Sequence, residues 1–200
     1  MNAWHESKED PVSVYTISLF LHIVGALGLF AVLSVEWAGL AQLRRATGVA
    51  QARESARLLA GPRAVGGPAS LLILVTGIHM TATRWGPQGW IVVGLAGMVI
   101  IAVLSIAVSG RRTAAIARVL PTEDGPIPAA VRQRLQDPVL PLALRVRTAL
   151  FLGVVFLMAT EPGTGISLTA LAVAAIAGVA AALAAREEGD HQARAVESQP

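Results

Sequence analysis

Cysteine is absent from this sequence of 200 residues, and charged residues are scarce. Without cysteine the chain has no disulfide, no thiolate metal site and no thiol nucleophile. Charged residues make up 14% of the chain and apolar residues 54%, and the mean hydropathy is +0.61. A typical soluble domain carries about 25% charged residues. This composition excludes an ordinary soluble domain and indicates a membrane protein.

Familiar catalytic motifs are also missing. The chain has no Gly-rich phosphate loop, no nucleophile elbow and no HExxH sequence. Lysine occurs once, at Lys8, and the formal net charge is only +3 despite a pI near 10.5. The arginines lie mainly at the ends of apolar runs, where membrane topology requires them. This placement argues against nucleic acid as a partner and leaves open whether the protein is an enzyme.

Long apolar runs are the dominant feature of the sequence. A run of about 20 apolar residues suffices to cross a bilayer as a helix. The fold class predicted is therefore all-α: a polytopic membrane helix bundle with a four-helix core and one appended helix. The shorter stretches at 44–59 and 128–136 suggest surface helices. The five expected spans are 14–40, 65–83, 90–109, 139–160 and 166–185.

The basic residues predict the orientation of the bundle. With five spans and the N-terminus outside, the inner segments hold 14 of the 16 Lys and Arg residues, as the positive-inside rule requires. This count includes Arg145 and Arg147 in the fourth span, whose long side chains can reach the near interface. We therefore expect a multi-pass protein of the cell (inner) membrane. Residues 1–13 form an extracytoplasmic leader in this scheme, and 186–200 form a disordered cytoplasmic tail.

Two histidines lie within the spans, where an ionisable side chain needs a partner. His22 shares a helical face with Gly25 in the first span, and His79 belongs to a polar stripe with Thr76 and Thr83 in the second. The helical rise places His22 about 12 Å and His79 about 7 Å below the outer ends of their spans. Antiparallel spans could bring both imidazoles into one pocket that binds haem b or a copper ion. Alternatively, each histidine hydrogen-bonds a neighbouring hydroxyl or carbonyl.

Glu36 is a carboxylate near the inner end of the first span. Arg145 and Arg147 lie at the same expected depth in the fourth span. A glutamate at this depth is paired or protonated. We expect a structural ion pair with one of the two arginines, and a role in proton transfer is the alternative.

The fifth span is rich in alanine and contains a row of small residues. Such a row lets helix backbones approach closely. The row could hold a second copy of the chain or another membrane protein, or it could reflect alanine richness alone. Its members are Ala174, Gly178 and Ala182.

Four segments resemble a group of bacterial membrane proteins. The group includes the copper-resistance D family, the membrane protoporphyrinogen oxidase of the haem pathway and several uncharacterised families. The first span carries their "LH(I/L)xG" motif at His22, and "GPASLLILVTGIHM" is similar to their second span. "RWGPQGWIVVGLAGMVI" resembles their Trp-led third span, and "VVFLMATEPG" the end of the fourth. The resemblance covers about residues 13–162.

The resemblance implies a four-helix core and, for the oxidase branch, haem b held by the span-one histidine and a lysine in span three. Alignment on Trp90 places that lysine position at Gly94, so this chain lacks the second ligand and His79 would have to replace it. We therefore expect a membrane protein that binds haem b or a metal ion through His22 and His79, with a redox or metal-handling role. A small transporter component and a structural accessory subunit without a cofactor are the alternatives.

Overall fold

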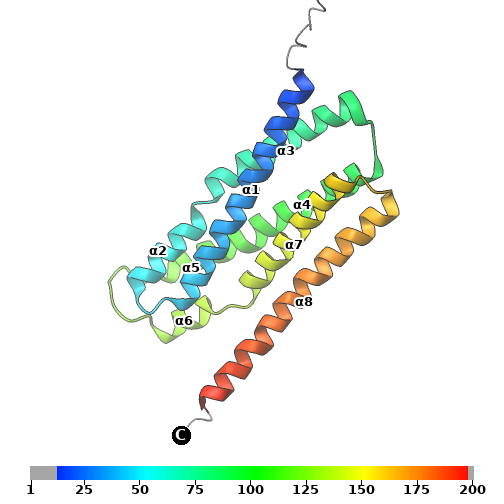
Figure 1. Cartoon of the computed structure of the whole chain (residues 1–200). Helices are drawn as coiled ribbons and strands as arrows, with labels where there is room; N and C mark the ends of the chain where they lie inside the picture. The colour runs from blue at the N-terminus through cyan, green and yellow to red at the C-terminus, as the bar shows by residue number, and fades with distance from the viewer. Residues whose placement is uncertain (1–12, 198–200) are drawn as a thin grey trace, which may run out of the picture.

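The computed structural model describes residues 13–197, with side chains described throughout except at Arg63 and residues 189–197. Every regular element in this range is helical, which confirms the all-α class (Figure 1). Five segments are long and apolar enough to cross a membrane. They are Val14–Arg45, Val49–Trp85, Gly89–Val119, Ala129–Thr160 and Thr164–Glu188.

Each membrane segment is a helix or a chain of helices. The first is α1 alone, and the second consists of α2, α3 and a π-helix, η1. The third consists of α4, a second π-helix, η2, and α5, while α6 precedes α7 in the fourth. The bounds are α1 Val14–Arg45, α2 Val49–Ala60, α3 Arg63–Met80, η1 Thr81–Trp85, α4 Gly89–Val103, η2 Leu104–Gly110, α5 Arg111–Val119, α6 Ala129–Leu135, α7 Val139–Thr160 and α8 Thr164–Glu197.

Helix termini follow from residues suited to capping and turns. Ser13 caps α1 by accepting a hydrogen bond from the backbone N–H of Thr16 at 3.2 Å. Just before α7, the Oδ1 of Asp137 accepts from the N–H of Val139, the first residue of that helix, at 2.8 Å. Gly86 ends η1 with φ +67°, a conformation that costs glycine little.

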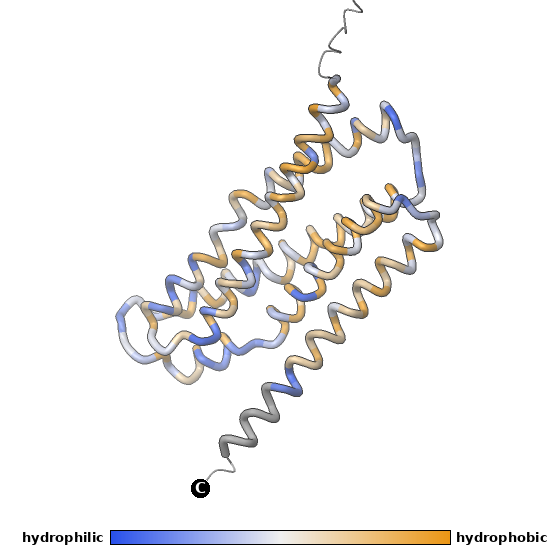
Figure 2. Tube along the Cα trace, viewed as in Figure 1, coloured by the Kyte–Doolittle hydropathy of each residue, from blue (hydrophilic) through white to orange (hydrophobic). Residues whose placement is uncertain are grey.

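The spans pack in two groups. The two ends of the bundle differ in the segments that connect the spans. α1 packs along α3, and α7 packs against α4 and α8 (Figure 1). The turns at 86–88 and 161–163 lie at one end, here called the turn end. The linkers around α2, α5 and α6 lie at the other, here called the arginine end. Figure 2 shows hydrophilic residues gathered at both ends and apolar residues along the helices between them.

Large apolar side chains point outward along the spans. Phe20 is 63% exposed, Ile106 75% and Ile176 68%. In water such exposure over a whole bundle would favour aggregation, whereas in a bilayer these side chains contact lipid chains. The outward apolar surface therefore supports the assignment as a multi-pass membrane protein.

The arginine end has a small core of its own. The amphipathic helices α2, α5 and α6 bury apolar residues that include Val49, Ile116 and Leu135. The N–H of Val49 donates to the carbonyl of Gly125 at 2.9 Å and fixes the linker that precedes α6. Ion pairs join this end across the chain: Arg53 with Asp124 and Arg112 with Asp137.

The predicted span bounds and the helix bounds differ at several ends. α7 covers Val139–Thr160 as predicted, and surface helices occur where 44–59 and 128–136 suggest them. The third span continues beyond residue 109 through α5. Residues 186–197, predicted to be disordered, continue α8. Alanine, arginine and glutamate favour helix propagation from an established helix, which explains the difference. Most of the predicted leader, residues 1–12, lies outside the described range.

Candidate functional site

The two intramembrane histidines lie on one seam between antiparallel helices, α1 and α3. His22 of α1 meets Thr76 of α3, and His79 of α3 meets Ser18 of α1. The His22 Nδ1 lies 3.0 Å from the Thr76 Oγ1, and the His79 Nδ1 lies 2.9 Å from the Ser18 Oγ. The imidazoles are half-buried and lie on adjacent turns of the seam, so each is tied to the opposite helix.

The hydroxyl of Thr76 bears on which His22 nitrogen carries the proton. The Thr76 Oγ1 lies 2.6 Å from the Leu72 carbonyl oxygen, a distance at which its single hydrogen is donated to that carbonyl. With the hydrogen used there, the Thr76 oxygen accepts from the Nδ1 of His22 in one of the two neutral tautomers. This tautomer leaves a lone pair on Nε2, the nitrogen that can then coordinate a metal.

Glycines bring α1 and α3 into close contact beside the histidines. A Cβ at Gly25 would lie 2.8 Å from the Ile73 Cγ1 and 3.1 Å from the Ala69 carbonyl oxygen. A Cβ at Gly77 would lie 3.4 Å from the His22 Cε1, so the imidazole lies directly over the α3 backbone. Small residues on both helices thus hold the ring at the seam.

Thr83 does not join the histidine seam. It lies in η1, is exposed, and donates its hydroxyl to the backbone carbonyl of His79 at 2.8 Å. The predicted stripe therefore divides: Thr76 and His79 contact α1, whereas Thr83 bonds its own helix. The break occurs where the α-helix changes to a π-helix, because the wider turn rotates the residues that follow.

A second polar cluster lies closer to the arginine end, between α1, α7 and η2. Arg147 donates through Nη1 to the Oε2 of Glu36 at 2.7 Å and to the Oγ of Ser109 at 3.2 Å. The side chain of Arg147 is 4% exposed and that of Glu36 is 15% exposed. Within residues 13–197 the Nε of Arg147 is buried without a hydrogen-bond partner. The cluster is thus a buried ion pair in which the Nε donor of Arg147 is unused.

Arg145 has a different role from Arg147. Its guanidinium carbon lies 5.4 Å from the centroid of the Trp37 ring, a cation–π arrangement. The Nε1 of Trp37 donates to the Oγ1 of Thr148 at 3.0 Å. Neighbouring residues of α1 therefore contact neighbouring residues of α7 in two polar ways, one through Glu36 and the other through Trp37. Of the two arginines predicted as partners of Glu36, Arg147 forms the ion pair and Arg145 does not.

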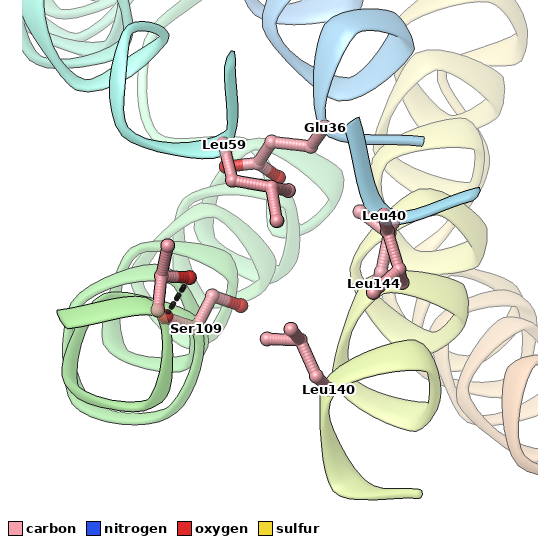
Figure 3. Close-up of a pocket in the computed structure, with 7 residues that line it drawn as sticks. Glu36, Leu40, Leu59, Ser109, Leu140 and Leu144 are labelled. Atoms are coloured by element: carbon pink, nitrogen blue, oxygen red, sulfur yellow. Dashed lines mark hydrogen bonds between the residues drawn. The ribbon is translucent and has the colours of Figure 1, made fainter. Parts of the chain in front are cut away.

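A small cavity adjoins the Glu36 carboxylate. Figure 3 shows Glu36 and Ser109 directed toward it from α1 and η2, with leucines closing the other sides. Its volume is about 20 Å³, enough for one water molecule. Thr113 also lines it and donates its hydroxyl to the Ser109 carbonyl at 2.7 Å. The polar lining could serve one bound water, but the space is too small for a larger ligand.

The predicted small-residue row is used within the chain. A Cβ at Gly178 would lie 2.7 Å from the Val146 Cα, so α8 contacts the α7 backbone there. Ala174 contacts the same helix near Gly153, and Ala182 is 3% exposed. Gly178 and Ala182 are therefore buried against the bundle and Ala174 is half-buried, while an oligomer or membrane partner at this row stays a prediction.

Several contributors to the two clusters carry no sequence signal. Ser18 and Ser109 are serines in apolar runs, where serine commonly bonds its own helix backbone, as Ser105 does. The π-helix that carries Ser109 has no marker residue such as proline. The described residues hold no group of three or more His, Cys, Asp or Glu side chains able to enclose a metal ion. A closed tetrahedral zinc site is therefore absent from this part of the chain.

Comparison with protein families, curated proteins and solved structures finds no match to the chain. The functional argument therefore rests on the residues and their geometry.

Proposed function

We propose that the protein is a multi-pass protein of the cell membrane that binds haem b through His22, with His79 as the second imidazole. A copper ion is the alternative group at the same residues. The tautomer of His22 carries the proposal. In the tautomer we propose, Nδ1 donates to Thr76, whose own hydrogen is used at Leu72, and the lone pair lies on Nε2.

The hydrogen bond at Nδ1 matches a general property of metal-ligating histidines. Such residues donate the other ring N–H to a nearby acceptor, which fixes the ring and raises the basicity of the ligating nitrogen. Thr76 supplies this acceptor to His22, and Ser18 lies in the corresponding place beside His79. Haem iron takes only its axial ligands from protein, so two imidazoles suffice. Two imidazoles also suit copper, whereas a closed zinc site needs four ligands.

The bound group would supply one-electron redox chemistry. The chain supplies the ligand, its orientation and a surrounding of low polarity, because lipid-facing apolar residues flank the seam. The resemblance of "YTISLFLHIVGALGLF" to the copper-resistance D and oxidase group supports the same residue, His22.

Absorbance spectroscopy of the purified protein tests the proposal. The full chain is purified in detergent, supplied with haemin and separated from free haemin by gel filtration. We expect a Soret band that His22→Ala abolishes and His79→Ala shifts or weakens. Thr76→Val should lower affinity by about 10–100-fold, because it removes the acceptor of Nδ1. His191→Ala, outside the spans, is the matched control and should leave the band unchanged.

Copper is distinguished by metal analysis of the same samples. If the protein holds stoichiometric copper that depends on His22 and shows no Soret band, the bound group is copper and not haem. Protein that binds neither group after reconstitution would contradict the proposal, and the histidines would then serve only as hydrogen-bonded ties between α1 and α3.

Transport is the second candidate, favoured by the cavity that adjoins the Glu36 carboxylate. Its volume limits the species at that point to water or a proton. Proton flux in liposomes that falls on Glu36→Gln, with the fold intact, would support this candidate. Equal flux in both proteins would contradict it.

A further inference from the structure

The two turns at the turn end form a pocket distinct from both intramembrane clusters. Its volume is about 300 Å³, the lower end of the range for small-molecule sites. A side chain at Gly89 would collide with Thr164, so α4 and α8 begin in direct contact. The pocket is lined by Trp85, Gln88, Gly89, Trp90, Glu161, Pro162, Gly163 and Thr164.

Two tryptophans form an aromatic wall of this pocket. The ring centroids of Trp85 and Trp90 are 5.7 Å apart, and the rings are nearly perpendicular at 88°. The Nε1 of Trp85 donates to the hydroxyl of Tyr15 at 3.2 Å, which holds that ring in place. The wall therefore belongs to η1 and α4, and Tyr15 of α1 holds the Trp85 ring before any ligand binds.

Glu161 alone among the lining residues is charged. Its backbone has left-handed geometry, φ 46° and ψ 49°, a conformation uncommon for glutamate. The described part of the chain shows no ion pair for its carboxylate within 4.0 Å. Arg84 lies close in sequence to the wall, but its guanidinium stacks over Tyr15 at 4.9 Å from the ring centroid. Among the described residues, the carboxylate at this pocket therefore has no paired cation.

Helix dipoles do not offset this charge. Two helices, α4 and α8, begin at the pocket, and two others, η1 and α7, end there. N-terminal ends are partially positive and C-terminal ends partially negative, so the four contributions oppose one another. The Glu161 carboxylate and the indole rings therefore determine which ligand charge the pocket prefers.

We propose that this pocket binds a small organic ammonium group. A carboxylate attracts the positive charge, and tryptophan rings bind ammonium groups through their π-faces better than other side chains do. The source is either a soluble amine or the amine headgroup of a phospholipid, since tryptophans of membrane proteins concentrate at the headgroup level. Exposure of the carboxylate to solvent keeps its contribution to the affinity small.

Tryptophan fluorescence of the full-length protein in detergent tests this site, with choline as the probe. A Trp37→Phe background removes the signal of the described tryptophan that lies outside the pocket. We expect a saturable change with choline and none with 3,3-dimethylbutan-1-ol, which has the same shape without charge. Glu161→Gln should weaken choline binding about fivefold, the size of an exposed charge contact. Glu54→Gln, exposed beside Arg57 at the arginine end, is the matched control.

Lipid nanodiscs distinguish the two sources of ammonium. If the headgroup is the occupant, discs with phosphatidylethanolamine should suppress the choline response that discs with phosphatidylglycerol retain. A response in both kinds of disc identifies a soluble amine. An equal response to choline and the neutral alcohol, or a choline response unchanged by both Glu161→Gln and Trp90→Leu, would overturn the proposal.

Discussion

Glu36 and Arg147 are 111 positions apart in the sequence, yet their side chains meet at 2.7 Å inside the bundle. The contact joins α1, which packs on α3, to α7, which packs on α4 and α8. Taking both charges out of water costs several kcal/mol each, and their mutual attraction offsets this cost only while both partners remain. The pair therefore makes the stability of the bundle depend on how its two groups of helices meet.

Removing one partner of this pair should be much worse than removing both. We expect Glu36→Gln or Arg147→Gln alone to lower the free energy of unfolding by about 3–5 kcal/mol, because an unpaired charge stays buried. The double variant should lose less than the sum of the single variants. SDS titration in mixed micelles measures all four proteins of the cycle, and additive losses would show that the two charges do not interact.

Arg145→Gln is the matched control for this cycle. Arg145 lies two positions from Arg147 but contacts the Trp37 ring instead of Glu36. Its loss should cost less than about 1 kcal/mol, the usual size of a cation–π contact. Its effect should also add to that of Glu36→Gln.

The sequence does not predict which of these two arginines pairs with Glu36. Hydropathy alone locates the spans, and the charge pattern places both arginines at the depth of Glu36. Residues two positions apart are separated by about 200° around a helix, so only one of the two arginines can meet Glu36, and the other meets the Trp37 ring instead. Which one does depends on the rotation of α7, and packing sets that rotation. Buried Leu150, Val154 and Leu157 hold α7 against its neighbours.

The histidine seam, too, could be predicted from the sequence only in part: the pair of helices could be predicted, but the hydroxyl partners could not. Similar depth in the outer half and antiparallel spans bring His22 and His79 to one pair of helices, as the structure has them. The pairing of each ring with a hydroxyl depends on register, and Ser18 is an ordinary residue in an apolar run. Thr83 illustrates a further limit, because the π-helix after Met80 removes it from the stripe.

The hydrogen bond between Trp37 and Thr148 should contribute measurably to stability. Thr148→Val keeps the shape but leaves the indole N–H without its acceptor. We expect a loss of about 1 kcal/mol, since the group is only partly buried and lies in a membrane protein. Thr160→Val is the control, because that hydroxyl is exposed and bonds its own helix. Equal losses in the two variants would show that the indole contact contributes nothing.

Close packing at Gly25 should not tolerate even one methyl group. The new Cβ in Gly25→Ala would lie 2.8 Å from the Ile73 Cγ1 and 3.1 Å from a backbone oxygen that cannot rotate away. We expect a loss of about 1–3 kcal/mol in the free energy of unfolding. Gly94→Ala is the matched control, since no atom lies within 4 Å of its new Cβ. That variant should be neutral or gain up to about 1 kcal/mol through helix propensity. A loss at both positions would point to a general intolerance of alanine.

The basic residues predict that the arginine end lies in the cytoplasm and the turn end outside. Five spans place the start of α1 and the end of α8 on opposite sides of the membrane, and the positive-inside rule chooses between the two orientations. A reporter that is active only in the cytoplasm, fused after Pro200, should therefore be active. The same reporter placed in the 161–163 turn should be inactive, because that turn lies at the opposite end. Arg84 at the turn end provides the control, since Arg84→Gln should leave both results unchanged. Activity at the turn and silence at Pro200 would reverse the orientation, and activity at both would remove α8 from the set of spans.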